Sequence, residues 1–188
     1  SSMENVYFEG IDKISPDDID YGKQLNFVLK PLSVGMQNKD QITLGSFPAF
    51  VKTDSLLASI QNENNAVLVN AENVGGTMYS GPGAGAKPTA NSVLSDVIDI
   101  ARGKIFDYGK FVEQNLSSSF DNFSCDRYLK LQVNDKPGVV AKISTLLAKN
   151  NLSIDNLIQK ELERSDDQIP LVMVLSNSDE TTIQDTIK

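Results

Sequence analysis

The sequence predicts an α+β protein, with a mostly antiparallel sheet that has helices on one face and a second, smaller unit after it. Three observations support this prediction. Short runs of β-branched and aromatic residues alternate with polar turns through the first 80 residues. A glycine-rich segment then leads into an amphipathic helix. Beyond residue 126 the expected order is strand, helix, strand, strand, helix, which begins a split βαββαβ unit.

Local signals divide the first part into short elements. The run Ser15-Pro16-Asp17-Asp18 supplies a helix cap, a proline at the first helical position and acids in the first turn, so a helix is expected to about Leu25. Asp54 is expected to cap a short helix over residues 55–61. Prolines within the second and third strand segments indicate an edge or a bulge. The five strand segments are 5–11, 26–36, 41–52, 65–72 and 75–80.

A glycine-rich segment over residues 81–89, with the sequence GPGAGAKPT, leads into a helix of about 14 residues. Five apolar residues of this helix recur at helical spacing and share one face. They are Val93, Leu94, Val97, Ile98 and Ala101.

The glycine-rich segment is the strongest candidate for a ligand site in the first part. It is not a P-loop, because Ala86 and Pro88 stand where that motif needs glycine and Ser or Thr, and its spacing differs from the dinucleotide fingerprint. Glycines let a backbone approach a flat ring or a phosphate closely, and a helix starting near Thr89 points free N–H groups toward the loop. The alternative is a tight strand-to-helix turn that Thr89 caps.

The pattern changes after a polar cluster at residues 115–122. We therefore expect a first domain over residues 1–104, a linker over 105–126 and a second domain over 127–188. The elements expected in the second domain are strands over 128–133, 152–163 and 168–176, a turn over 134–138, and helices over 139–150 and 179–188. One more strand would complete the split unit, so this domain is expected to lack its last strand.

Composition excludes several classes of function. The net charge of −8 argues against nucleic acid as a partner, and the absence of histidine removes Ser-His catalysis, Cys-His catalysis and imidazole metal sites. The single cysteine, Cys125, cannot form an internal disulfide, which favours a reducing compartment. No apolar run approaches the roughly 20 residues of a membrane helix. The acidic pairs Asp166-Asp167 and Asp179-Glu180 lack the ligand spacing of a metal site, so neither a metal nor a membrane partner is expected.

Residues 128–188 resemble an ACT domain. The segment Asn134-Asp135-Lys136-Pro137-Gly138-Val139-Val140 matches that family's Asp-x-Pro-Gly-hydrophobic turn, and Asn151-Leu152-Ser153-Ile154 matches the entry to its second strand. ACT domains are ferredoxin-like modules that usually bind amino acids, often across a dimer interface. The resemblance implies a regulatory ligand site, and the alternative is a capped turn that only starts the helix. The implied site residues are Asn134, Asp135, Gly138, Val139 and Ile154.

Residues 5–104 resemble the C-terminal part of the homoserine dehydrogenase catalytic domain. The matching stretches are Tyr7-Phe8-Glu9-Gly10-Ile11, residues 27–32, residues 65–67 and residues 81–90, the last running into Asp96 and Arg102. The fold implied by both resemblances is a partial catalytic domain of α+β class followed by a ferredoxin-like ACT domain.

The resemblance implies an oxidoreductase that interconverts L-homoserine and L-aspartate 4-semialdehyde in threonine, methionine and isoleucine synthesis. NAD or NADP is the implied cofactor and the cytoplasm the implied compartment. An amino-acid effector, with L-threonine first, and a homodimer or homotetramer are the implied partners. The glycine-rich segment is expected to close over the nicotinamide end of the cofactor. The residues implied in cofactor binding are Gly81, Gly83, Ala84, Gly85 and Thr89.

In this family the nucleotide-binding domain, the catalytic lysine, the substrate-binding acids and a monovalent-cation site precede the Glu-Gly-Ile strand. No catalytic residue is therefore expected in this chain, and the chain alone is expected to be inactive. Glu9 is expected to face outward from its strand, and Lys30 to form an ion pair or extend from a sheet edge. The alternatives are a direct substrate role for Glu9 and a place in the catalytic cleft for Lys30. Two rival functions are a non-catalytic amino-acid sensor and a structural dimerisation module.

Overall fold

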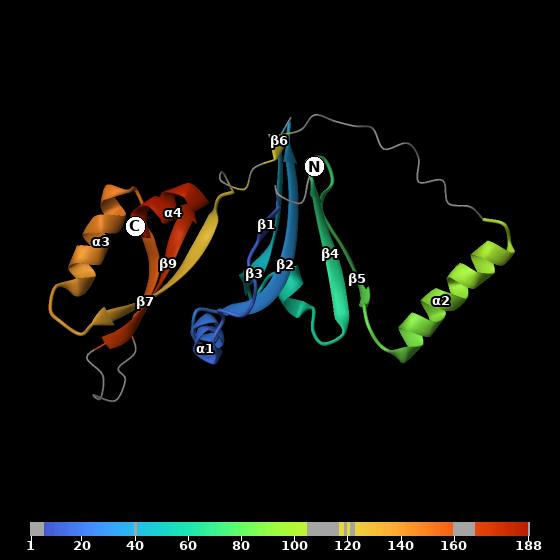
Figure 1. Cartoon of the computed structure of the whole chain (residues 1–188), viewed down its shortest axis with the longest axis horizontal. Helices are drawn as coiled ribbons and strands as arrows, with labels where there is room; N and C mark the ends of the chain where they lie inside the picture. The colour runs from blue at the N-terminus through green and yellow to red at the C-terminus, as the bar shows by residue number, and fades with distance from the viewer. Residues whose placement is uncertain are drawn as a thin grey trace. The chain divides into compact units, whose positions relative to one another are not determined.

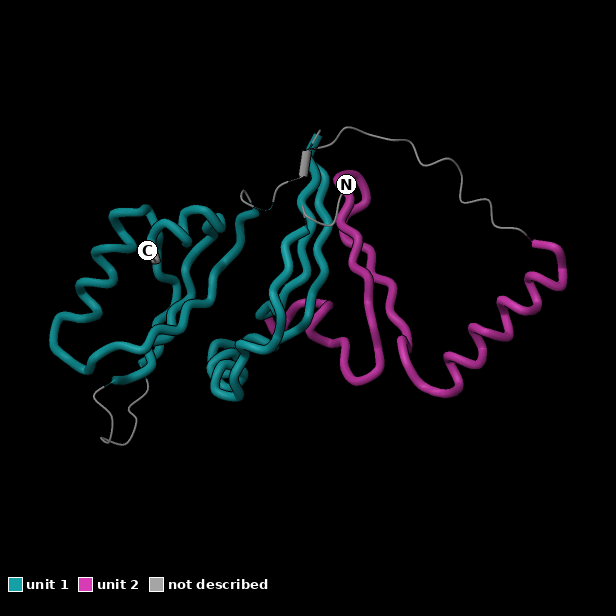
Figure 2. The backbone as a smooth tube through the Cα atoms, in the orientation of Figure 1, with its two compact units in different colours: residues 1–50, 115–188 teal, residues 51–114 magenta. Residues whose placement is uncertain are grey.

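The computed structural model describes residues 6–39, 41–104, 117–118, 120, 123–159 and 168–187. These residues form two compact units, one built from residues 1–50 and 115–188 and the other from residues 51–114 (Figure 2). Figure 1 shows their helices and strands, with labels where there is room. No helix in the described ranges combines the length and the apolar character needed to cross a bilayer.

The first unit opens with a small sheet in which β3 (Gln41–Lys52) is central and β2 (Phe27–Asn38) lies at one side. On the other side of β3, two short strands pair with it in parallel: β1 (Tyr7–Phe8) and β6 (Ser117–Ser118). The expected strand over residues 5–11 was too long. Among its described residues, Tyr7 and Phe8 pair with Gly45 and Ser46 of β3, and the Glu9 N–H adds one hydrogen bond to the Ser46 carbonyl at 3.0 Å.

The helix α1 (Pro16–Gln24) starts as the sequence predicted. The Ser15 Oγ accepts a hydrogen bond from the Asp18 N–H, and the Ser15 N–H donates to Asp18 Oδ2 at 2.8 Å, which forms a reciprocal capping box. Pro16 occupies the first helical position, where its missing N–H costs nothing. Tyr21 and Gly22 face inward, and a Cβ at Gly22 would collide with the ring of Phe50.

A cluster of aromatic rings fixes β1 against this sheet. Tyr7 stacks on Phe120 with ring centroids 4.2 Å apart, and Phe47 lies edge-on to both rings. Phe123 stacks on Phe120 at 4.7 Å. Since aromatic pairs of this geometry stabilise by about 0.5–1.5 kcal/mol each beyond area burial, the cluster holds a strand with only two paired residues.

The rest of the first unit is a three-stranded antiparallel sheet with two helices. Its strand order is β7-β9-β8. The central strand β9 carries the core, with Leu171, Val172 and Leu175 fully buried and Met173 1% exposed. Central position explains the continuous apolar run of this strand, because both of its faces and both of its edges are covered. The elements are β7 (Cys125–Asn134), α3 (Val139–Lys149), β8 (Ile154–Gln159), β9 (Gln168–Ser178) and α4 (Glu180–Ile187).

The second unit is built differently. Its strands β4 (Asn64–Ala71) and β5 (Gly75–Pro82) form an antiparallel ribbon, in register from Asn64 opposite Pro82 to Ala71 opposite Gly75. The helix expected over residues 55–61 is a shorter 3₁₀ turn, η2 (Leu56–Ser59). The prediction that Asp54 caps it was wrong, since the Ser55 hydroxyl accepts the hydrogen bond from the Leu57 N–H.

Helix α2 (Ala86–Ala101) begins three residues earlier than the sequence predicted. Its cap is Gly85, whose φ of 113° is open to glycine and costly for other residues. Thr89 is therefore not the cap but a first-turn residue, and its N–H donates to the Gly85 carbonyl at 3.1 Å. Pro88 is tolerated because the first helical turn needs no N–H donor at that position.

The apolar stripe of α2, as predicted, lies on one face, but the described residues do not bury it. Val93, Leu94 and Val97 are each more than half exposed, and Ile98 is 39% exposed. No described residue of this helix is buried. The stripe is therefore a surface rather than part of a core within this chain.

Candidate functional site

The glycine-rich segment is an exposed connection between β5 and α2. Gly81 and Pro82 still belong to the ribbon, where Gly81 lies opposite Asn65, so the loop proper is Gly83 to Gly85. The Gly83 N–H donates to the Glu63 carbonyl at 2.7 Å. A Cβ at Gly83 would collide with the side-chain amide of Asn65. The loop thus follows a path that requires glycine at this point.

The start of α2 has the character of an anion site. No side chain within the described part of the chain caps this helix, and Ala84, Gly85 and Thr89 are exposed. Free N–H groups at a helix start carry partial positive charge and favour phosphate or carboxylate oxygens. All five residues expected to bind a cofactor lie in or beside this loop, at Gly81, Gly83, Ala84, Gly85 and Thr89. Their role in binding remains a prediction.

The turn between β7 and α3 is a second helix start without a side-chain cap. Gly138 adopts a left-handed conformation with φ of 90°, which explains why glycine is needed there. The Lys136 N–H donates to the Asn134 carbonyl at 2.8 Å, and this bond tightens the turn. Asn134 and Asp135 are exposed beside Gly138, and Val139 is half-buried. Four of the expected effector residues therefore lie together.

Ile154, the fifth expected effector residue, lies elsewhere in the same sheet. Asn134 is opposite Gln168 at one end of β9, whereas Ile154 is opposite Leu175. At about 3.3 Å per residue, these positions are roughly 20 Å apart. One copy of the chain does not bring Ile154 to the turn.

A polar junction links helix α1 to strand β7. The Asp18 carboxylate is 3% exposed and accepts a hydrogen bond from Tyr128 Oη at 2.7 Å. Lys130 Nζ lies 2.6 Å from the same carboxylate oxygen and 3.0 Å from Ser15 Oγ. One carboxylate therefore completes the cap of α1 and also anchors β7.

The junction shifts the pKa of its members. Burial alone would raise the pKa of Asp18, but hydrogen bonds from Lys130, Ser15 and Tyr128 outweigh it and lower the pKa to about 2. Burial and the hydrogen bond to Asp18 raise the pKa of Tyr128 well above its ordinary range. Asp18 is thus ionised and Tyr128 neutral at physiological pH. Tyr128 and Lys130 lie in the strand that the sequence predicted over residues 128–133, but the sequence did not indicate their partner Asp18, which is 110 residues before Tyr128.

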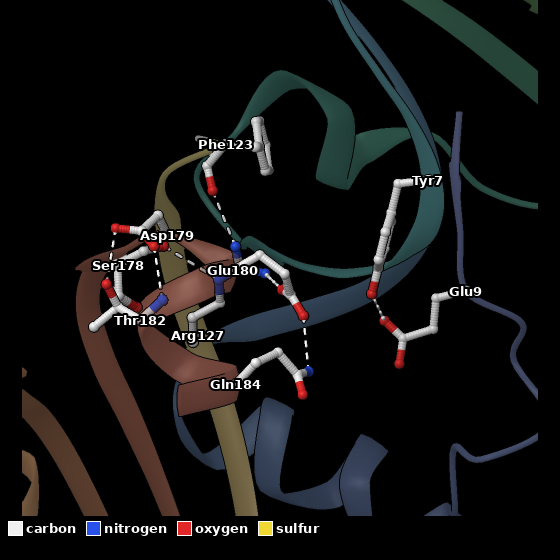
Figure 3. Close-up of polar contacts among 9 residues, drawn as sticks. All are labelled: Tyr7, Glu9, Phe123, Arg127, Ser178, Asp179, Glu180, Thr182 and Gln184. Atoms are coloured by element: carbon white, nitrogen blue, oxygen red, sulfur yellow. Dashed lines mark hydrogen bonds and ion pairs between the residues drawn. The ribbon is translucent and has the colours of Figure 1, made fainter. Parts of the chain in front are cut away.

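A second polar cluster surrounds Arg127 (Figure 3). Its guanidinium forms an ion pair with Glu180 at 2.9 Å and donates to the carbonyls of Ser178 and Phe123. Gln184 donates to the other oxygen of Glu180 at 3.0 Å. These contacts join the first turns of α4 to β7. Each of the three guanidinium nitrogens of Arg127 takes part in one of them.

A cavity of about 270 Å³ lies beside this cluster. Its polar lining includes Tyr7, Glu9 and Gln184, and its apolar lining comes from leucines such as Leu129 and Leu175. Tyr7 Oη donates to Glu9 at 3.1 Å, and burial together with the Glu9 charge raises the pKa of Tyr7 to about 12. Glu9 is exposed, as expected, while its strand neighbour Tyr7 is half-buried.

The remaining sequence candidates are Lys30 and the two acidic pairs. Lys30 is half-buried within β2. Asp179 accepts hydrogen bonds from the Thr182 N–H at 2.8 Å and from its hydroxyl at 3.0 Å, and the backbone bond leads in lowering the Asp179 pKa. The pair Asp166-Asp167 lies outside the described residues. Within the described ranges, no group of three His, Cys, Asp or Glu side chains is placed to hold a metal ion.

The described elements include a three-stranded α+β unit and a β-ribbon followed by a helix, and comparison with known families assigns both parts of the chain. The ACT domain family model matches residues 127–188. The homoserine dehydrogenase family model matches residues 1–98, just over half of the chain. The chain belongs to the homoserine dehydrogenase family.

Individual relatives agree with this assignment. The homoserine dehydrogenase of Helicobacter pylori is 36% identical over 167 residues, covering 88% of this chain and 40% of the relative. That of Pseudomonas aeruginosa is 33% identical over 196 residues, covering 98% and 45% respectively. The crystal structure of a homoserine dehydrogenase from Thiobacillus denitrificans matches with a TM-score of 0.78 at 28% identity, covering 99% of this chain and 44% of that one. The chain thus spans less than half the length of these relatives.

Proposed function

We propose that this chain works as part of a homoserine dehydrogenase, which interconverts L-homoserine and L-aspartate 4-semialdehyde with NAD or NADP in the cytoplasm. The observation that carries the proposal is the uncapped start of α2 behind the Gly83–Gly85 loop, within the segment that matches the family. Free N–H groups and close backbone approach suit the phosphate and ring portions of a dinucleotide.

The chain's own residues position the cofactor in this proposal. The cofactor, when bound, supplies the hydride acceptor or donor. The loop, from Gly81 through Ala84 and Gly85 to Thr89, lines one side of the nicotinamide end and excludes water from it. Asn65 supports the loop from β4, because its side chain fills the space that a Cβ at Gly83 would need. The exposed stripe of α2 offers the adjoining surface for the nucleotide-binding part of the enzyme.

A matched pair of glycine substitutions tests the role of the loop. We expect Gly83→Ala, in the product of the complete native gene, to raise the KM for the cofactor by about tenfold, since a loss of about 1.4 kcal/mol in binding has that effect. Gly35→Ala is the control, because a Cβ there meets only ordinary contact with Leu44. Absence of homoserine-dependent reduction of NAD or NADP in that gene product would refute the proposed activity.

We further propose that the turn from Asn134 to Val139 binds an amino-acid effector, with L-threonine as the first candidate. The N–H groups at the start of α3 would hold the effector carboxylate, and Asn134 and Asp135 its ammonium. Ile154 would then come from a second copy, because it lies at the far end of the sheet in the same chain. The effector site is thus proposed across a homodimer.

Calorimetric titration of the 188-residue chain tests the effector site. We expect L-threonine to bind in preference to L-homoserine, and Asp135→Asn to weaken binding by about tenfold or more through loss of a charged hydrogen bond. Asp96→Asn, an equal change at an exposed position of α2, should leave binding unchanged. No heat with either amino acid would refute the effector site and leave the enzymatic proposal to the loop variants.

A further inference from the structure

The side chain of Asn65 lies against the glycine-rich loop. Asn65 in β4 is opposite Gly81 in β5, so both residues face the same side of the ribbon. Gly83 follows two positions after Gly81, and alternation along the strand would direct a side chain there to that same side. A Cβ built at Gly83 would lie 2.6 Å from Asn65 Cγ, and the three heavy atoms nearest to it all belong to Asn65. The absence of a side chain at Gly83 therefore makes room for the Asn65 amide.

The Asn65 amide is available to a ligand. Its side chain is exposed, and within the described ranges no hydrogen bond from the protein reaches it. The preceding residue differs, because Asn64 Nδ2 donates to the Gln61 carbonyl at 3.1 Å. A primary amide offers two N–H donors and one carbonyl oxygen. Contact with Gly83 and a short side chain limit the directions in which Asn65 presents these groups.

The loop itself has few groups for polar recognition. Gly83, Ala84 and Gly85 carry no side chain larger than a methyl group. The Gly83 N–H is already used, since it donates to the Glu63 carbonyl at 2.7 Å. A polar group that enters beside Gly83 therefore meets the Asn65 amide as its side-chain partner.

The chemistry of this position favours a neutral ligand group. Neither β4 nor β5 contains an Asp, Glu, Lys or Arg. Phosphates and carboxylates are held best by cations or by the N–H groups of a helix start, and the start of α2 offers the latter. At the nicotinamide end of a dinucleotide, the ring carboxamide places an N–H donor and a carbonyl acceptor side by side. The Asn65 amide has the complementary arrangement.

We propose that Asn65 recognises the carboxamide of the nicotinamide ring. Asn65 Nδ2 donates to the carboxamide oxygen, and Asn65 Oδ1 accepts a hydrogen bond from the carboxamide N–H. This inference rests on the proposed function, because it assigns a contact with the cofactor that the glycine-rich loop covers. Gly83 then admits the ring by its lack of a side chain, and Asn65 determines which group on the ring is accepted.

Calorimetric titration of the product of the complete native gene tests the proposal. The ligands are NAD or NADP and the 3-acetylpyridine analogue of the same cofactor, in which a methyl group replaces the carboxamide nitrogen. We expect the native protein to bind the carboxamide form about tenfold more tightly, and Asn65→Ala to bind both forms equally. Asn64→Ala is the matched control, because it removes the same side chain from the next position, on the other face of the ribbon. It should keep the preference for the carboxamide.

A second variant separates recognition from support of the loop. Asn65→Leu keeps a side chain of similar size against Gly83 but removes the donors and the acceptor, so it should also abolish the preference, with an unchanged circular dichroism spectrum. A native protein that binds both forms equally overturns the inference. So does a preference that survives both Asn65 variants, even where both forms bind more weakly. Those two results leave the proposed function intact, whereas a native protein that binds neither form overturns both proposals.

Discussion

The two units of this chain differ in how they bury apolar surface. In the ACT part, β9 alone places four large side chains at 0–1% exposure, and Leu147 and Leu152 close the core around Leu171, Met173 and Leu175. In the second unit, Ala58 is the only described hydrophobic residue classed as buried, while Val67, Tyr79 and the stripe of α2 stay exposed.

This difference shows where the chain is self-sufficient and where it depends on other surfaces. A three-stranded sheet under two helices can exclude water by itself, which suits a module that senses a ligand. A two-stranded ribbon and a single helix cannot exclude water by themselves, because they have no further element to pack against. The glycine-rich loop lies between that ribbon and that helix, so we expect it to become rigid only when both are covered.

The largest expected effect is the difference in stability cost between the same substitution at a buried position of the first unit and at an exposed position of the second. Leu171→Ala should lower the free energy of unfolding of the ACT part by about 2–5 kcal/mol, because the side chain is fully buried. Leu94→Ala, the same change on the exposed stripe of α2, should cost no more than about 0.5 kcal/mol. Urea denaturation followed by circular dichroism measures both. Equal costs would contradict the contrast between the units.

A smaller effect is expected at the junction between α1 and β7. Lys130→Met leaves the buried Asp18 carboxylate without its cation and should destabilise the first unit by about 2–3 kcal/mol, as expected for a lost hydrogen bond to a charged group. Lys23→Met removes the exposed pair with Asp20, whose side chains are 68% and 63% exposed, and should cost less than about 1 kcal/mol. Similar denaturation midpoints for the two variants would show that the junction contributes little.

The lowered pKa of Asp18 predicts that the folded protein loses stability in acid. The folded pKa of Asp18 is about 2, below the ordinary value of 3.8, so its contribution is complete above pH 4 and disappears as the pH falls toward 2. The amount is about 2 kcal/mol. Urea midpoints measured across this range should fall more steeply for the native sequence than for Asp18→Asn. If the urea midpoints of the two proteins fall equally with pH, Asp18 is not the cause of the acid-dependent loss of stability.

Local chemistry was enough to predict much of this fold. Ser15 and Pro16 marked the start of α1, alternation marked the strands, and the turn at Gly138 marked the start of α3. The errors came from neighbouring residues that could each cap the same helix, where the sequence alone does not show which one does. Ser55 rather than Asp54 capped η2, and Gly85 started α2 ahead of Thr89 because glycine alone tolerates its φ of 113°.

The candidate sites were less predictable than the fold. The glycine-rich loop and the turn from Asn134 to Val139 are each continuous in sequence, so the structure keeps the residues of each together, while Ile154 lies at the other end of the sheet. The binding roles of all these residues stay predictions. The junction of Asp18 with Tyr128 and Lys130 and the cluster of Arg127 with Glu180 depend on tertiary contacts. The exposure of α2 was also hidden, because periodicity identifies an apolar face but not the surface that covers it.

Amide hydrogen exchange of the whole chain tests the central contrast most directly. We predict slow exchange across β7, β8 and β9, limited by unfolding of the first unit, and fast exchange in β4, β5 and α2 through local opening at low protein concentration. Equal protection in both units would contradict the account, because it would show that the second unit is stable without a partner surface.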